Sequence, residues 1–103
     1  MYVIDDTLHA SAVVAGGSKH SRRALREAVG CECARVIVAC DEAEAYELSR
    51  RYVPDVIVLA GRYALDKIRR DQELAAVPVI CLDEQVEAAD VTAQVRAVLQ
   101  RPR

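Results

Sequence analysis

The sequence predicts an α/β domain in which a parallel sheet of about four strands is covered by helices on both faces. Short runs rich in Val, Ile and Ala alternate along the chain with amphipathic stretches of helical length. The chain has 103 residues, which is enough for one hydrophobic core and too few for two. Because it contains no Phe and no Trp, this core has to be built from aliphatic side chains.

Four runs that are apolar at consecutive positions suit strands that are covered on both faces. A further apolar segment, Met1–Ile4, precedes them and could be either an added edge strand or a surface tail. No internal repeat or linker interrupts the pattern, so a single domain over residues 1–103 is expected. The predicted strands are Ala12–Ala15, Arg35–Ala39, Val56–Leu59 and Val77–Leu82.

The first two predicted helices have recognisable ends. The first takes Ser18 as its N-cap and stops at Gly30. The second opens with Asp41 and Glu44 at the spacing of a capping box and ends before Pro54. The residues expected on their inward faces are Ala24, Leu25, Ala28 and Val29 in the first helix, and Ala45, Leu48 and Tyr52 in the second.

Two more helices complete the alternation. The third is expected from about Tyr63 to Leu74, and the fourth from about Ala89 to Arg101, where Pro102 stops it. Strands that alternate with helices of this length imply right-handed crossovers between parallel strands. The expected inward-facing residues are Ala64, Leu65 and Ile68 in the third helix, and Val91, Val95, Val98 and Leu99 in the fourth.

Charge and hydropathy argue against several classes of protein. Fourteen Lys and Arg against sixteen Asp and Glu give a net charge of −2, which is too balanced for a general binder of nucleic acid or membrane surfaces. No apolar run approaches the ~20 residues needed to span a bilayer. Met1 is followed by apolar and acidic residues and not by the basic segment of a signal peptide. We therefore expect a cytoplasmic protein.

The four cysteines and two histidines suggest little catalytic or metal-binding chemistry. Cys40 and Cys81 stand at the ends of apolar runs and are expected to behave as small hydrophobic residues. Cys31 and Cys33 form a C-E-C pair without the further ligands that a structural zinc site needs, although a redox or metal role stays open. Neither histidine belongs to a recognisable nucleophile motif. No catalytic residue, metal or cofactor is predicted.

Two segments carry a resemblance to a known family. RRYVPDVIVL at residues 50–59 and LAAVPVICL at residues 74–82 resemble, in wording and order, the receiver domains of bacterial two-component response regulators. In that family a Pro-Asp pair leads the third strand and a Pro-Val-Ile segment forms the fourth. The resemblance covers about residues 11–82 and, more weakly, the last predicted helix. It implies a three-layer, CheY-like or flavodoxin-like fold with strand order 2-1-3-4.

The residues that carry the family's chemistry are replaced. In a working receiver an acid pair after the first strand binds Mg²⁺ beside an Asp that follows the third strand and accepts a phosphoryl group. By resemblance, Gly16 and Gly17 stand at the acid pair and Ala60 at the phosphoacceptor. These residues offer neither a carboxylate ligand nor a nucleophilic oxygen. A rival register, with Asp5-Asp6 as the acid pair, fails on spacing.

The chain is also shorter than the family pattern. Only Gly61 and Arg62 separate Ala60 from the third predicted helix, and about six residues, Asp83 to Ala88, separate the fourth strand from the last helix. The family's fourth helix and fifth strand are therefore expected to be missing. The fourth strand would then lie near the sheet edge, where unpaired backbone groups invite a partner strand or a covering segment. Met1–Ile4, from the same or another subunit, is a candidate cover.

Two functions follow as hypotheses. The first is a phosphorylation-independent regulatory module that acts by binding protein, including a second copy of itself, in bacterial signalling or transcription control. The second is a binder of a small anion or nucleotide at the turn before the first helix, where free N–H groups and the helix dipole favour negative charge. Nucleic acid and membranes are not expected partners. The residues of the possible anion site are Gly16, Gly17, Ser18 and Lys19.

Overall fold

The computed structural model describes residues 10–15, 19–60, 64–82 and 88–100, and within these the side chains of all but residues 19–21, 88 and 89. Four parallel strands form one sheet in the order β2-β1-β3-β4, as predicted. The elements are β1 (Ser11–Ala15), α1 (Lys19–Gly30), β2 (Arg35–Ala39), α2 (Glu42–Tyr52), β3 (Val56–Leu59), α3 (Leu65–Arg70), β4 (Val79–Cys81) and α4 (Ala88–Leu99).

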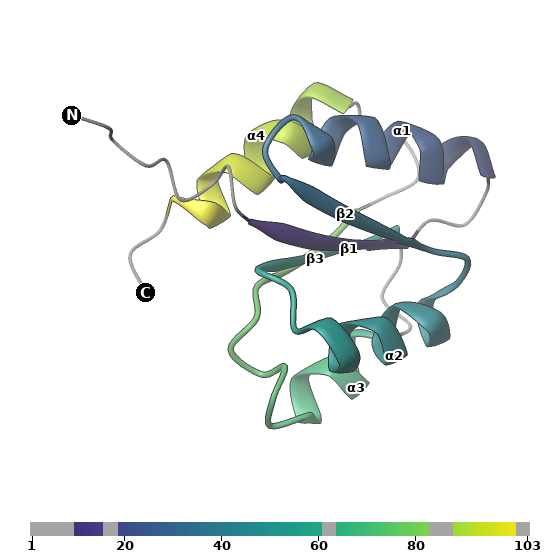
Figure 1. Cartoon of the computed structure of the whole chain (residues 1–103), viewed down its shortest axis with the longest axis vertical. Coiled ribbons are helices and arrows are strands. Elements are labelled where there is room, and N and C mark those ends of the chain that lie inside the picture. Colours follow the sequence, from purple (N-terminus) through teal and green to yellow (C-terminus); the bar gives the residue numbers. More distant parts are fainter. Residues whose placement is uncertain (1–9, 16–18, 61–63, 83–87, 101–103) are drawn as a thin grey trace.

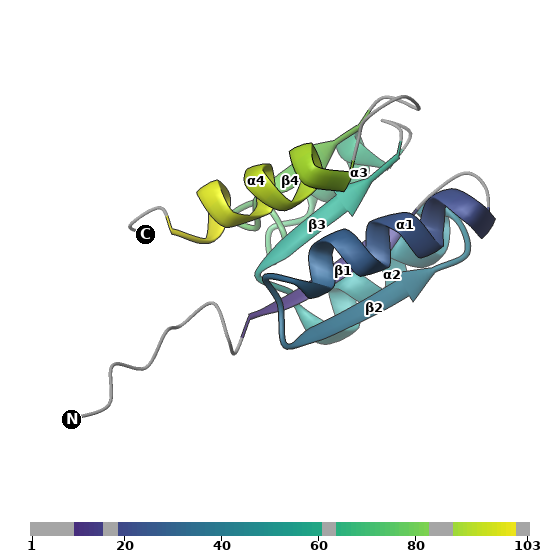
Figure 2. The same cartoon turned by 90° about the horizontal axis from the view of Figure 1, so that it is seen from above.

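The sheet lies between two helical layers (Figures 1 and 2). Helices α1 and α4 cover one face, and α2 and α3 cover the other. Because side chains alternate along a strand, each strand supplies both cores: Val14 packs under α1 and α4, and its neighbour Val13 packs under α2 and α3. The two central strands, β1 and β3, are buried throughout except at Ser11. No helix among the described residues is long and apolar enough to cross a membrane.

Strands β2 and β3 begin and end at the predicted residues, whereas α3 and β4 are shorter than predicted. Helix α3 ends at Arg70 because the next residue, Asp71, is extended (φ −79°, ψ 120°). The Asp71 carboxylate accepts the N–H of Glu73 at 2.9 Å, which forms an Asx turn in competition with the helix. Leu74 is consequently buried from a turn and not from a helix.

Two expected inward-facing residues are exposed. Ala24 is exposed while Leu25, Ala28 and Val29 are buried, because successive helical residues differ by about 100° and Ala24 falls outside the stripe. Tyr52 is 48% exposed. It is the last residue of α2, directly before a chain reversal at Val53 in the left-handed conformation (φ 40°, ψ 77°), so its ring has little core to pack against.

Candidate functional site

Ala60 lies beside the end of β1, at the carboxyl edge of the sheet. The register pairs Ala15 with Leu59, and the N–H of Ala60 donates to the C=O of Ala15 at 2.8 Å. Ala60 is half-buried and packs against the core under α1 and α4. This edge is where open parallel sheets bind ligands. Ala60, which by resemblance stands at the phosphoacceptor position, thus follows β3 at this edge, and its side chain is only a methyl group.

The other predicted site residues cannot be placed in the same way. Gly16, Gly17 and Ser18 lie outside the described residues. Lys19 is the first residue of α1, and its side chain is not described. The anion site at this turn stays a prediction.

Three acids at the start of α2 lie at the same edge, and each accepts a backbone N–H. Asp41 is the N-cap and accepts the N–H of Glu44 at 2.7 Å, which confirms the predicted cap. In a capping box the side chain of the third helical residue accepts the N–H of the N-cap residue. Here the Glu44 carboxylate accepts instead the N–H of Cys40, the residue before the N-cap, at 3.2 Å. Glu42 reaches across to the N–H of Ala64, also at 3.2 Å, just before α3.

The contact between Glu42 and Ala64 could not be found in the sequence, because the two residues are 22 positions apart and share no local pattern. The same holds for Arg22 of α1, whose guanidinium donates to the C=O of Cys40 at 3.1 Å, 18 positions away. Both contacts tie loops at the carboxyl edge to neighbouring elements. Within the described part of the chain, no three His, Cys, Asp or Glu side chains form a group that could hold a metal ion.

The Pro-Asp pair lies at the opposite, amino edge of the sheet. The Asp55 carboxylate accepts the N–H of Ser11 at 2.8 Å and the Ser11 hydroxyl at 3.4 Å. The N–H of Asp55 donates in turn to the C=O of Ser11 at 2.9 Å. Pro54, before it, is buried. This pair therefore fastens the start of β1 to the start of β3, which is a structural role remote from Ala60.

None of the four cysteines forms a disulfide. Cys33 is buried, and its burial, followed by the negative charges of Asp55 and Glu32, raises the pKa of its thiol to about 11. Cys81 is half-buried and packs against the core under α2 and α3, as expected of a small hydrophobic residue. Cys40 does not, because β2 ends at Ala39 and places it in an exposed turn.

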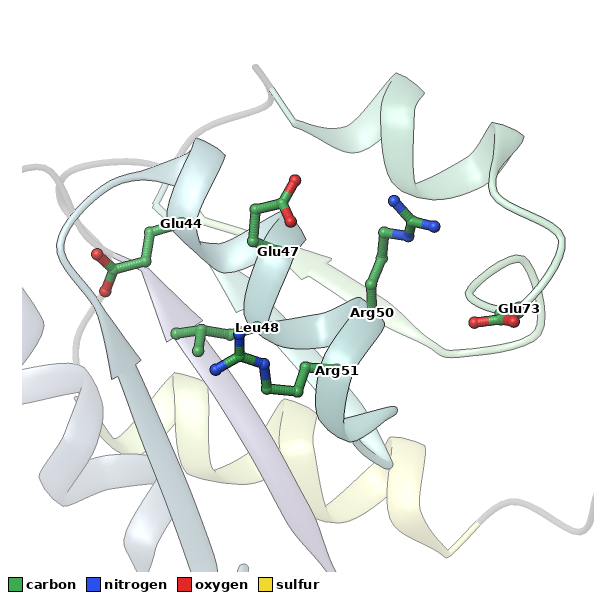
Figure 3. A pocket seen from close by; sticks show the side chains of 6 residues that line it. All are labelled: Glu44, Glu47, Leu48, Arg50, Arg51 and Glu73. Atoms are coloured by element: carbon green, nitrogen blue, oxygen red, sulfur yellow. The ribbon is translucent and has the colours of Figure 1, made fainter.

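Two open depressions lie on the layer formed by α2 and α3, away from Ala60. One has a volume of about 390 Å³. Figure 3 shows Glu47 and Arg50 on the side of α2 that faces α3, with Leu48 and Arg51 on the other side and Glu73 on the turn after α3. The other has a volume of about 680 Å³, and its lining includes Tyr46 and Lys67. Both linings contain acidic and basic side chains, and neither includes Ala60.

The strand order and the two helical layers define a CheY-like receiver fold. The solved structure of the chemotaxis response regulator CheY4 of Vibrio cholerae is similar, with a TM-score of 0.74 and 13% identity over 87% of this chain and 98% of that chain. A response regulator from Desulfuromonas acetoxidans has a TM-score of 0.72 and 13% identity over 88% of this chain and 97% of that chain. No family model and no curated protein matches the sequence. The fold expected from the resemblance is thus confirmed.

Proposed function

We propose that this protein is a receiver-like regulatory module that works without phosphorylation, by binding protein partners in bacterial signalling or transcription control. One observation carries the proposal: the residue that directly follows β3 beside the end of β1 is Ala60. A phosphoryl group needs an oxygen nucleophile to receive it, and a methyl group has none. The sequence also places Gly16 and Gly17, which have no carboxylates, immediately after β1.

The neighbouring acids support the same reading. A Mg²⁺ ion needs several oxygen ligands at close to octahedral geometry. The described carboxylates at the start of α2, those of Asp41, Glu42 and Glu44, are each engaged with a backbone N–H. Moving one of them to a metal would cost a helix cap or a loop contact, roughly 1 kcal/mol for a cap. These residues are poor substitutes for an acid pair, and we propose no enzymatic activity.

The test is phosphorylation by a small donor. The full chain is incubated with Mg²⁺ and acetyl phosphate, and hydroxylamine-labile phosphate is measured by phosphate-affinity electrophoresis. We expect none. The matched variant, Gly16→Asp/Gly17→Asp/Ala60→Asp, restores the three carboxylates and should give a phosphorylated species. Ala60→Asp alone should form this species only weakly. Hydroxylamine-labile phosphate on the unmodified chain would show that another side chain serves as acceptor and would refute the proposal.

A second candidate function is the binding of a small anion or nucleotide before α1. The observation that favours it is the start of α1 at Lys19, four residues after β1 ends at the carboxyl edge. Calorimetric titration with phosphate and nucleotides tests it, with Lys19→Ala as the control. A binding heat that saturates with the unmodified chain and is weaker with Lys19→Ala supports this function. If no ligand gives a binding heat, the first proposed function is favoured.

A further inference from the structure

Strand β4 ends the sheet on one side. Among the described residues it pairs only with β3, and α3 and α4 flank it on the two faces (Figure 2). The hydrogen bonds to β3 fix which backbone groups point inward. The C=O of Pro78 accepts from Ile57 at 3.0 Å, and the N–H of Leu82 donates to Leu59 at 2.8 Å. Backbone groups alternate along a strand, so the N–H and C=O of Val79 point away from β3.

This outer edge lacks the usual protection against pairing. Natural edge strands carry charged residues, proline or bulges that prevent another strand from adding to the sheet. The segment LAAVPVICL at residues 74–82 contains no charged residue. Pro78 lacks its N–H on the side that faces β3, so it does not protect the outer side. Val77 and Val79 are half-buried against the core under α2 and α3.

We propose that β4 pairs in antiparallel orientation with β4 of a second copy of this chain, with the two Val79 residues opposite each other. An identical strand fits because each Val79 directs one donor and one acceptor outward, and a two-fold axis between them lets each donate to the other. No charge on either strand opposes the contact. The inference rests on the proposed function, since it names a partner for a module that acts by binding protein.

The first test measures oligomeric state by light scattering and sedimentation equilibrium of the full chain. The unmodified protein should reach twice the chain mass of 11.3 kDa. Val79→Lys places two like charges at the axis and should weaken the dimer at least about tenfold. The matched control is Ile37→Lys on β2, at the other sheet edge, because Ile37 is also half-buried against the same core. It should leave the dimer unchanged. Circular dichroism confirms that each variant is folded.

The second test introduces no charge at position 79, so it does not require the folded chain to tolerate a lysine there. In a hydrogen-bonded antiparallel pair the two Cα atoms are about 5.5 Å apart, which is within reach of a disulfide. Val79→Cys is made in a background in which the exposed thiols are removed by Cys31→Ser and Cys40→Ser. Mild oxidation should give a covalent dimer that a reductant cleaves. The background protein and its Ile37→Cys variant should stay uncrosslinked.

A protein that is folded but monomeric at the highest soluble concentration overturns the inference. This holds whichever other occupant, residues 1–9 or a different protein, covers the edge of β4. So does a dimer that Ile37→Lys breaks and Val79→Lys does not. The two proposals fail separately. A dimer that takes up hydroxylamine-labile phosphate refutes the proposed function alone, and a monomer that resists the phosphodonor refutes the pairing of β4 alone.

Discussion

Replacing Asp55 with alanine should destabilise the fold although the residue lies far from Ala60. Its carboxylate accepts the N–H of Ser11 at 2.8 Å, a bond to a charged acceptor that is worth about 1.5–3 kcal/mol. The contact to the Ser11 hydroxyl is long, 3.4 Å, and should add little. The backbone bond from Asp55 to Ser11 survives the substitution. We therefore expect Asp55→Ala to lower the free energy of unfolding by about 2 kcal/mol.

Urea unfolding followed by circular dichroism measures this loss. For a domain of this size a loss of 1 kcal/mol lowers Tm by roughly 4–8 °C, so thermal unfolding gives a second reading. Asp55→Asn keeps an acceptor without the charge and should lose about half as much. The control is Asp66→Ala, because Asp66 is exposed in the first turn of α3, and a surface change of this kind stays within about 0.5 kcal/mol.

A mutant cycle with Ser11→Ala locates the interaction. That variant keeps the backbone N–H and removes only the distant hydroxyl, so it should cost less than about 0.5 kcal/mol, with or without Asp55. Equal losses in Asp55→Ala and Asp66→Ala would refute the reasoning. A Ser11→Ala loss as large as that of Asp55→Ala would show that the hydroxyl, and not the N–H, makes the anchor.

Three further predictions concern single side chains. Ser49→Ala should raise the free energy of unfolding by about 1 kcal/mol in urea titrations, because Ser49 is fully buried and its hydroxyl has no hydrogen-bond partner among the described residues; a loss of stability would contradict this. Tyr46→Phe should raise the pKa of Asp71 in NMR titrations, since the Tyr46 hydroxyl, at 2.9 Å, contributes most to holding that pKa below its usual value. Arg50→Ala should raise it less, and the reverse order would be inconsistent with the contacts. Because the pKa of Cys33 is raised from 9.0 to about 11, its contribution to stability is complete below pH 9.0 and is lost as the pH rises toward 11. Urea titrations should show a flatter pH profile for Cys33→Ala, and identical profiles would argue against a buried thiol.

The sequence predicted the parts of the fold that local patterns determine. Strands β2 and β3 coincide with short runs of mostly apolar residues, and a strand covered on both faces needs such a run. The cap at Asp41 is a pattern of four consecutive residues. The shortening of α3 depends on Asp71, whose side chain competes with helix propagation, and apolar periodicity does not register that competition.

Other features depend on contacts between distant residues. Ser49 is polar, and a pattern of apolar positions assigns such a residue to the surface, yet it is buried beside Ala45 on the inward face of α2. The bond between Ser11 and Asp55 joins residues 44 positions apart. Ala60 could be located because the resemblance supplied the strand order, from which the neighbour of β3 follows. Without that order, no local pattern places Ala60 beside the end of β1.

The described hydrogen bonds at the carboxyl edge show that the receiver fold does not depend on an acidic side chain at position 60. The described hydrogen bonds at this edge are made by backbone groups, by carboxylates that accept from them and by the Arg22 guanidinium, and none of them involves the side chain of Ala60. The fold therefore does not need an acid at that position, and an alanine there costs no described hydrogen bond. By the same reasoning, Ala60→Asp should leave the caps at Asp41 and Glu44 in place. Phosphorylation of the variant with three restored carboxylates then tests the chemistry in a scaffold whose described hydrogen bonds do not depend on the side chain of Ala60.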